Sequence, residues 1–540
     1  MKDQRLQIAD IVRHIDDATL GILNVPEFQR KYVWRASKVA DLVDSLWRGY
    51  PIGTLLLWES PSSYDSPRTA LGTQGRKLWI IDGQQRVTSL ALLFGMKPYW
   101  WSDATQWNKF SEKYSVLVNI GKDKDDLEFG LVNPVRRKSS EWLPVRTVLH
   151  STNLSELALQ VSEKLTDSKR FAEIHEKLQS IRKIENAQLY EIIVDHELED
   201  VAEIFGRLNT AGTKIRESDI VVALVAAKQQ GWIRQKFDPF LKDLEQKGFE
   251  FDPAVVVRTL AIIGHGSARL RDVPQSFWES SDQFDEHWRK TKEAISTVIK
   301  NLVEYGVLSS DLLPSLNALI PIFVMKASFS KDFNFAKAFN WFLIATRDGR
   351  YSGSAITALD HDTKQIKSKK SFDEAIEDLT SRLSASGAFT SDEFREEYTD
   401  KFLRLILYLT AFNKEAKDWV NQDVRIGFDR EDNEINEGFK PEWHHVFPRK
   451  IVKDKFEGSL VDSIANIVVL NEKANRSFSA KLPRQYLKDH DVRPDRLEEQ
   501  AIPSNAPLDV DKFEEFLRLR AEKLAERATA YVQGLLHREA

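Results

Sequence analysis

Residues 444–483 read HHVFPRKIVKDKFEGSLVDSIANIVVLNEKANRSFSAKLP and carry the clearest pattern in this 540-residue sequence. Two adjacent histidines precede a short apolar step and a proline. Asn466 then opens the apolar run Ile467–Leu470, and Asn475 follows in a segment with a helical pattern. Asn466 lies 21 residues after His445, and Asn475 lies nine residues after Asn466. This spacing predicts two strands and a helix that bring four polar side chains around one point.

These residue types suit the hydrolysis of a phosphodiester. The reaction needs a base that deprotonates water and a cation that stabilises the negative charge on the phosphorus centre and the leaving oxygen. Histidine titrates near neutrality and suits the base, while a neighbouring histidine and an asparagine carbonyl can hold a divalent ion. Arg476 and Lys481 are the candidates for contacts with the flanking DNA phosphates.

The charge around this stretch is locally positive. The whole chain has a net charge of −5, but residues 444–484 contain eight Lys and Arg against four Asp and Glu. Phosphate contact requires only a local positive field, so an acidic chain does not exclude DNA as a partner. A surplus this small is, by itself, more typical of a solvated surface.

The stretch resembles the HNH, or ββα-metal, nucleases. Their pattern is Asp or His, then His-x-x-Pro, then Asn, then Asn or His in the closing helix, and HHVFP at 444–448 begins it here. The resemblance implies that His445 is the general base and that His444 and Asn475 bind the metal, Mg²⁺ or Mn²⁺. Asn466 would orient the loop of the base from behind. Many relatives have Asp where His444 stands, which leaves the metal preference open.

A second informative stretch, WIIDGQQRVT, covers residues 79–88. An apolar strand enters an Asp-Gly turn and a helix follows at once, so backbone N–H groups and the positive end of the helix dipole are available to an anion. Arg86 would add a forked donor, and Gln84 and Gln85 would position a water or a ribose. From the residues alone, an ordinary turn in which Asp82 caps the helix is slightly favoured.

Together with PEFQRKYVW at 26–34 and IFGRLNTAG at 204–212, this stretch resembles the ParB/sulfiredoxin-like domain of GmrSD-type modification-dependent (type IV) restriction enzymes. DGQQR is the signature of that domain, and an HNH module follows it in the family. The resemblance implies binding and hydrolysis of a nucleoside triphosphate and the sensing of modified DNA. The residues expected at the nucleotide are Asp82, Gly83, Gln84, Gln85, Arg86, Gln29, Arg30, Arg207 and Asn209.

The sequence predicts an α+β protein in three parts. Residues 1–225 form a mixed α/β, ParB-like domain, residues 226–400 a helical middle region, and residues 401–540 the HNH module embedded in helices. Strands are expected at Thr54–Trp58, Leu78–Ile81 and Leu189–Val194, and helices at Asp41–Trp47, Val87–Phe94, Val201–Leu208 and Asp511–Leu536.

Composition excludes several other classes. The chain has no cysteine, which excludes disulfides, thiol catalysis and cysteine-based zinc fingers and fits a reducing cytoplasm. Its N-terminus lacks an apolar core of signal-peptide length, and its apolar runs are too short to span a bilayer, so no membrane partner is expected.

The sequence therefore predicts a metal-dependent HNH endonuclease that restricts modified phage DNA, with an N-terminal domain that binds and hydrolyses nucleoside triphosphate. One alternative is a nucleotide-switched, ParB-like DNA-binding protein that does not cut. Another is a nuclease toxin that does not discriminate between DNAs. Double-strand cleavage with one HNH centre per chain would favour a homodimer.

Overall fold

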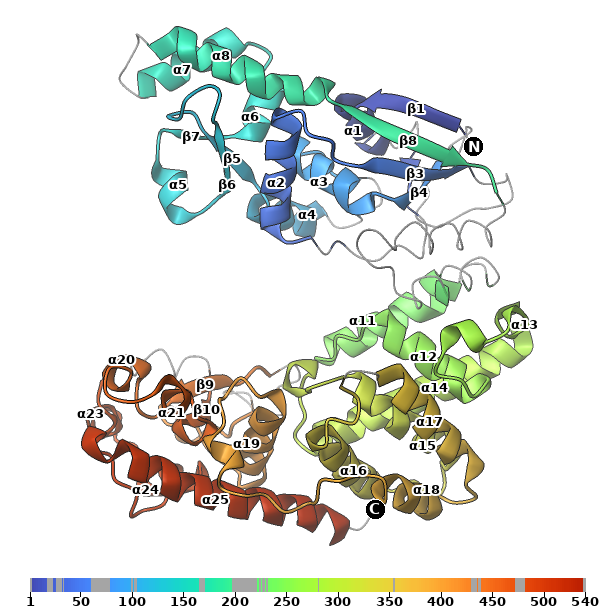
Figure 1. The fold of residues 1–540 in the computed structure, drawn as a ribbon, viewed down its shortest axis with the longest axis vertical. Helices are drawn as coiled ribbons and strands as arrows, with labels where there is room; N and C mark the ends of the chain where they lie inside the picture. Colours follow the sequence, from blue (N-terminus) through green and yellow to red (C-terminus); the bar gives the residue numbers. More distant parts are fainter. Residues whose placement is uncertain are drawn as a thin grey trace. The chain divides into compact units, whose positions relative to one another are not determined.

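The computed structural model describes residues 2–16, 23–25, 32, 34–59, 78–98, 101, 104–164, 170–196, 221–222, 225, 229, 232–279, 281–352, 355–428, 435, 439–471 and 481–537. They form a mixed, mainly helical α+β protein, which confirms the predicted class (Figure 1). The chain divides into two compact units, Met1–Gln235 and Lys236–Ala540. The parts expected at 226–400 and 401–540 thus lie almost wholly within one unit.

The first unit contains two sheets and the helices that cover them. Its elements are β1 (Lys2–Gln7), α1 (Ile8–Asp16), β2 (Leu23–Asn24), α2 (Ala36–Trp47), β3 (Thr54–Glu59), β4 (Leu78–Asp82), α3 (Gln84–Phe94), α4 (Ala104–Lys113), β5 (Val116–Asn119), β6 (Glu128–Leu131), α5 (Pro134–Lys138), β7 (Trp142–Pro144), α6 (Val145–His150), α7 (Leu154–Lys164), α8 (Phe171–Arg182) and β8 (Gln188–Val194). The larger sheet has the order β1-β8-β3-β4-β2, and the smaller, antiparallel sheet has the order β6-β5-β7.

The larger sheet mixes the two kinds of strand pairing. β1 pairs antiparallel with β8 and β3 antiparallel with β4, while β8–β3 and β4–β2 are parallel. The strands expected in β3, β4 and β8 are confirmed to within one residue at each end, because their apolar side chains enter one buried core with α1, α2 and α3. α3 begins three residues before the predicted Val87. The helix expected at Val201–Leu208 lies outside the described residues.

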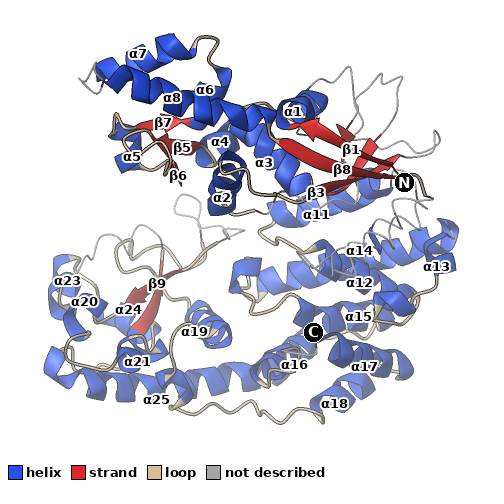
Figure 2. Cartoon of the chain, turned by 45° about the horizontal axis from the view of Figure 1, so that its top comes forward, coloured by secondary structure: helices blue, strands red, loops and turns tan. Residues whose placement is uncertain are grey.

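The second unit is mainly helical. Its elements are α11 (Asp238–Gln246), α12 (Pro253–Gly264), α13 (Gln275–Glu279), α14 (Ser281–Glu304), α15 (Ile320–Ser328), α16 (Phe335–Arg347), α17 (Ala355–Ser368), α18 (Phe372–Thr380), α19 (Lys401–Asn413), β9 (Glu442–His445), α20 (Arg449–Val452), α21 (Gly458–Val461), β10 (Ile467–Leu470), α23 (Pro483–Asp489), α24 (Pro494–Glu499) and α25 (Phe513–Gly534). Figure 2 shows one small strand region, at β9, among these helices. Among the described helices, none combines the length and the apolar character that crossing a membrane requires.

The long C-terminal helix is confirmed as a core element. α25 covers most of the predicted span 511–536 and buries its apolar face. The buried side chains of that face are Phe513, Phe516, Leu517, Leu524, Ala528, Tyr531 and, one residue past the end, Leu535. Arg520 lies on the same face, between Leu517 and Leu524 at helical spacing, and it is also fully buried.

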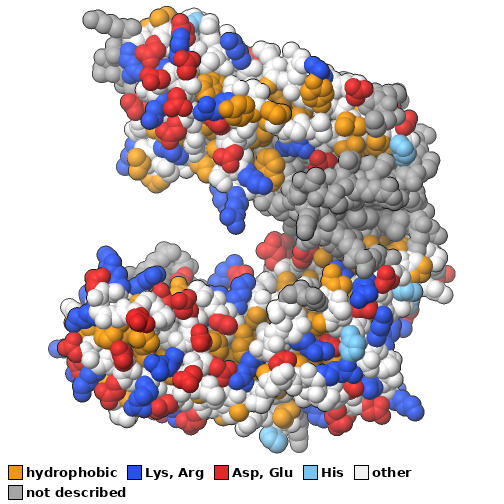
Figure 3. All heavy atoms as spheres, in the orientation of Figure 1, with side chains coloured by type: hydrophobic (Ala, Val, Ile, Leu, Met, Phe, Trp, Pro, Cys, Tyr) orange, Lys and Arg blue, Asp and Glu red, His pale blue; other side chains and the backbone are white. Residues whose placement is uncertain are grey.

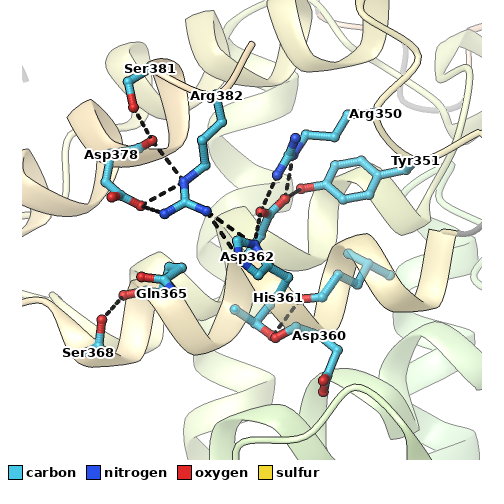
Figure 4. A network of polar contacts seen from close by, with 12 residues as sticks. Arg350, Tyr351, Asp360, His361, Asp362, Gln365, Ser368, Asp378, Ser381 and Arg382 are labelled. Atoms are coloured by element: carbon cyan, nitrogen blue, oxygen red, sulfur yellow. Dashed lines mark hydrogen bonds and ion pairs between the residues drawn. The ribbon is translucent and has the colours of Figure 1, made fainter.

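A buried carboxylate makes several side-chain contacts in the helical region that precedes β9. Asp362, on α17, is fully buried and accepts hydrogen bonds from Arg350 Nε at 2.6 Å and from the Tyr351 hydroxyl at 2.7 Å. Figure 4 shows both side chains converging on it, with Arg382 beside His361. A buried charge requires such partners, so this ion pair fixes the loop after α16 to α17.

Candidate functional site

The two strands expected around the histidines are present and pair with each other. β9 and β10 are antiparallel, with His445 opposite Ile467 and His444 opposite Val468. The short helices α20 and α21 lie in the chain between them. β10 consists of four fully buried apolar residues, which explains why this part of the chain forms a strand in the core.

His445 lies in a polar environment that the sequence pattern did not specify. Its Nε2 atom is 3.0 Å from Oδ1 of Asp462, and the two side chains are only 19% and 15% exposed. The second carboxylate oxygen of Asp462 faces the guanidinium of Arg449 at 3.3 Å. The edge of the Tyr398 ring meets the imidazole, with ring centroids 5.4 Å apart. The predicted base is therefore held from two sides.

The electrostatics of His445 favour a neutral ring. Burial lowers the pKa of His445 below its ordinary value, and Asp462 opposes this effect only in part. The ordinary pKa of a histidine side chain already lies below 7. A further lowering therefore keeps most of the imidazole neutral at pH 7. A neutral imidazole can accept a proton from water, as a general base must.

His444 has different neighbours from His445. Consecutive side chains of a strand point to opposite faces, and the buried His444 ring packs against Trp419 and Tyr486, with centroids 6.3 and 5.6 Å away. The sequence predicted that both histidines meet at one point. Within the described residues, the structure gives each of them its own set of contacts, on the two faces of β9.

Asn466 fixes the loop that follows His445. Its Oδ1 accepts a hydrogen bond from the backbone N–H of Phe447 at 2.9 Å. Its Nδ2 donates to the carbonyls of Phe447 at 3.1 Å and Val461 at 2.9 Å. The side chain is completely buried, so these bonds are shielded from competing water. Asn466 thus ties the end of β9 to the segment that carries Asp462.

Arg520 holds the backbone on both sides of Asn466. From α25, its guanidinium donates to the carbonyl of Ala465 at 2.7 Å, to that of Ile467 at 2.5 Å and to that of Gln500 at 3.1 Å. Complete burial lowers the pKa of Arg520 to about 9, which leaves it charged at pH 7. Three carbonyl dipoles compensate that charge.

Several basic side chains near the hairpin are already paired with acidic ones. Lys481 was expected at a DNA phosphate, and its Nζ lies 2.7 Å from Oδ2 of Asp489. Figure 3 shows basic and acidic side chains interspersed over this unit on the face drawn. Both partners are about 40% exposed, and a pair so accessible to water is weak and exchangeable. Lys450 and Lys453 are exposed at α20, next to the loop of His445. Arg476 lies outside the described residues.

Only one of the two expected metal ligands, His444, lies among the described residues. Asn475, the second expected ligand, lies outside the described residues. Among the residues that the structure describes, no group of three or more His, Asp or Glu is placed to hold a metal ion. His444, the first expected ligand, is described, and its buried ring packs against two aromatic rings.

The DGQQR stretch joins β4 to α3 through a left-handed glycine. Gly83 has φ 102°, and a Cβ there would lie 2.2 Å from Leu55 Cδ2. Gly53, in the turn before β3, has φ 89°, and its Cβ would lie 2.7 Å from Nη1 of Arg86. Both positions therefore require glycine, one for packing against the neighbouring strand and the other for the close approach of Arg86.

Arg86 makes contacts within the fold. Nη2 donates to Asp82 Oδ2 at 2.8 Å, and Nη1 donates to the carbonyls of Ile52 at 3.2 Å and Thr54 at 2.7 Å. The side chain is only 15% exposed. Asp82 does not cap α3, since Gly83 is the capping residue, so the alternative in which Asp82 caps the helix was wrong. The turn is instead stabilised by the Asp82–Arg86 ion pair.

The N-terminus of α3 retains groups that can bind a ligand. Gly83, the N-cap residue of this helix, has no side chain that could cap the first turn. Gln84 is 8% exposed, and its Oε1 has no hydrogen-bond partner among the described residues. A buried acceptor without a partner is costly unless a ligand or water supplies a donor. Gln85, the next residue, is half-buried.

Residues 8–226 match the family model of the GmrSD restriction endonuclease, N-terminal domain.

This GmrSD match contains DGQQR and ends well before the β9–β10 hairpin. It also contains the four other positions expected at the nucleotide, all of which lie outside the described residues: Gln29, Arg30, Arg207 and Asn209. A relative is known over a longer stretch. The uncharacterized protein MJ0686 of Methanocaldococcus jannaschii is 22% identical over 523 residues, covering 87% of this chain and 84% of its own.

The sequence pattern missed two residues of the hairpin site, Asp462 and Arg520, both beyond the GmrSD match. Asp462 lies between two apolar runs, four residues before Asn466, and a lone acid in such a place is a signal for a buried polar contact. Arg520 interrupts the apolar face of α25, which is the same kind of signal.

Proposed function

We propose that the chain is a metal-dependent HNH endonuclease that cuts DNA. The observation that carries the proposal is the position of His445, a mostly shielded imidazole on the β9–β10 hairpin that contacts Asp462. The match of the first unit to the GmrSD restriction endonuclease N-terminal domain supports DNA as the substrate. Local basic residues on α20 supply part of the positive field that phosphate binding needs.

In the proposed reaction His445 takes a proton from the attacking water. Asn466 keeps the loop of the base in place, and Arg520 supports Asn466 from behind. His444 and Asn475 would hold a divalent cation, which stabilises negative charge on the phosphate when bound. Phosphates on either side of the cleaved bond would contact Arg476 and Lys481.

Removal of the metal should stop DNA cutting. We expect excess EDTA to abolish nicking of a supercoiled plasmid and added Mg²⁺ or Mn²⁺ to restore it. The Asn475→Ala variant should require a higher metal concentration, because it removes one of two proposed ligands. The measurement is the nicking rate against free metal concentration, with Asn108, exposed on α4, changed to Ala as the control. Cutting that persists in excess chelator would exclude the HNH assignment.

We further propose that the α3 N-terminus binds the phosphates of a nucleoside triphosphate. The start of a helix attracts anions, and the buried Oε1 of Gln84 can accept a hydrogen bond from a ribose hydroxyl. Arg86 would act by fixing the turn, because three of its hydrogen bonds go to Asp82 and to backbone carbonyls. Nucleotide hydrolysis at this site would regulate cutting and couple it to the sensing of modified phage DNA.

Substitutions at this turn should weaken nucleotide binding. Gln84→Ala should lower affinity about fivefold, the equivalent of one neutral hydrogen bond of about 1 kcal/mol. Arg86→Ala should lower it at least tenfold and should also remove any dependence of cutting on nucleotide, since the turn loses its ion pair. Calorimetry with several triphosphates measures both, and Gln179→Ala, exposed on α8, is the control.

Unchanged nucleotide binding in both variants would mean that DGQQR is a structural turn only.

The two alternative functions are separated by nicking assays on plain and modified phage DNA, with nucleotide varied independently. A ParB-like switch protein would bind DNA without cutting it. A non-discriminating toxin would cut both DNAs equally, whatever the nucleotide.

A further inference from the structure

We propose that Asp462 is a positioning residue of the nuclease centre. It holds a proton on Nε2 of His445 and thereby leaves Nδ1 as the atom that takes a proton from water. The inference rests on the proposed DNA hydrolysis and adds to it which ring nitrogen acts and which side chain decides this. Asp462 belongs to none of the four positions of the histidine–asparagine pattern.

The direction of the hydrogen bond between His445 and Asp462 follows from the chemistry of the two groups. An ionised carboxylate can only accept hydrogen bonds, so the nitrogen that lies 3.0 Å from Asp462 Oδ1 must be the donor. In a neutral imidazole one nitrogen carries the proton and the other carries the lone pair. A donor at Nε2 therefore places the lone pair at Nδ1, and the reacting water has to approach that side of the ring.

Hydrogen bonds of its backbone hold Asp462 in place. Its N–H donates to the carbonyl of Gly458 at 3.0 Å, and its carbonyl accepts from the N–H of Tyr398 at 2.7 Å. Arg449 Nη2 lies 3.3 Å from the second carboxylate oxygen. The backbone bonds hold the segment of Asp462, and Arg449 and His445 contact its two carboxylate oxygens, so the carboxylate is kept beside the imidazole.

The imidazole ring is also restricted in rotation. Tyr398 meets it edge to face, at an interplanar angle of 78°. His445 and Asp462 are both largely shielded from solvent, so water competes poorly for their hydrogen bond. Turning the ring over would place Nδ1 toward the carboxylate and would lose this geometry.

The proposed step balances in atoms and charge. The lone pair on Nδ1 of His445 takes one proton from water, and the resulting hydroxide oxygen bonds to phosphorus. The bond from phosphorus to the leaving oxygen breaks, and that oxygen takes a proton from solvent water. The imidazolium cation formed faces the carboxylate of Asp462, which stabilises it without accepting the proton.

The test compares Asp462→Asn with Asp462→Glu and with Asp454→Asn, which removes an equal charge from an exposed position in the same segment. The asparagine variant keeps the shape of the side chain but can present its NH₂ group to Nε2. We expect kcat for plasmid nicking to fall by about 10–100-fold, the usual effect of losing a partner that orients a site residue. KM for DNA and the melting temperature should remain near wild type.

A spectroscopic readout distinguishes positioning from stability. With ¹⁵N-labelled histidine in the full chain, the ring nitrogens of wild-type His445 should report a proton on Nε2. In Asp462→Asn the signals should shift toward the other tautomer, while Asp454→Asn should match wild type. Asp462→Glu retains a carboxylate and should recover part of the lost kcat, which keeps the test valid where the asparagine variant folds poorly.

The outcomes separate this inference from the proposed function. His445→Ala, assayed in parallel, tests the hydrolysis itself, and full activity there would overturn both. If His445→Ala is inactive while Asp462→Asn retains full kcat, only the role of Asp462 is overturned. A fall in kcat with an unchanged tautomer, or a glutamate variant no better than asparagine, also overturns it.

Discussion

The His445→Ala variant is expected to lose DNA cleavage by a factor of about 10²–10⁴, because a positioned general base contributes this much to a rate. The change removes a small, partly exposed ring and leaves Asp462 paired with Arg449. Folding and DNA binding should therefore remain near wild type. The measurement is the single-turnover rate of plasmid nicking with enzyme in excess, together with DNA affinity by fluorescence anisotropy.

His537→Ala is the matched control, since this histidine is exposed beyond the end of α25. It should nick DNA like the wild-type protein. Full activity in His445→Ala would remove this residue from the mechanism. A joint loss of cutting and DNA binding would show that the variant acts through the fold and not through proton transfer.

The Asp362→Ala variant is expected to lower the free energy of unfolding by about 3–5 kcal/mol. Breaking a buried ion pair by removing one partner leaves an uncompensated charge, which accounts for a loss of this size. Here the stranded groups are the guanidinium of Arg350, 17% exposed, and the hydroxyl of Tyr351. Urea unfolding, followed by tryptophan fluorescence, measures the change from the shift of the transition midpoint.

Asp373→Ala provides the contrast. Asp373 pairs with Lys337 at 2.7 Å, but both side chains are well exposed, and exposed pairs contribute about 0–1 kcal/mol. The control should thus unfold close to the wild-type midpoint. A loss below about 1 kcal/mol in Asp362→Ala would mean that water or a rearranged loop satisfies Arg350 once the carboxylate is gone.

Periodicity in the sequence was sufficient for the elements that are decided locally. The apolar runs of β3, β4 and β8 and the stripe on α25 were predicted within a few residues, because burial of one face sets both the pattern and the element. The paired strands around the histidines were predicted for the same reason. The conformation around Asn475 stays a prediction.

Contacts between distant residues were not predictable in this way. Arg86 was assigned to a phosphate, yet its partners Ile52 and Thr54 lie more than 30 positions earlier, in a turn whose approach no local pattern encodes. The same holds for Asp462, whose contact with His445 depends on how the chain returns between β9 and β10. The separation of His444 from His445, by contrast, follows from the alternation of side chains along any strand, so it could have been predicted once β9 was recognised.

The dependence of the hairpin on Arg520 has a consequence for synthesis of the chain. Arg520 follows Leu470, the last residue of β10, by 50 positions, and translation at about 5–20 residues per second takes about 2.5–10 s to cover them. During that interval the carbonyls of Ala465 and Ile467 lack their donor, so the loop that carries the base has no support from α25. If the proposed nuclease centre depends on this support, we expect a growing chain that already contains the histidine–asparagine pattern to be unable to cut DNA until α25 docks.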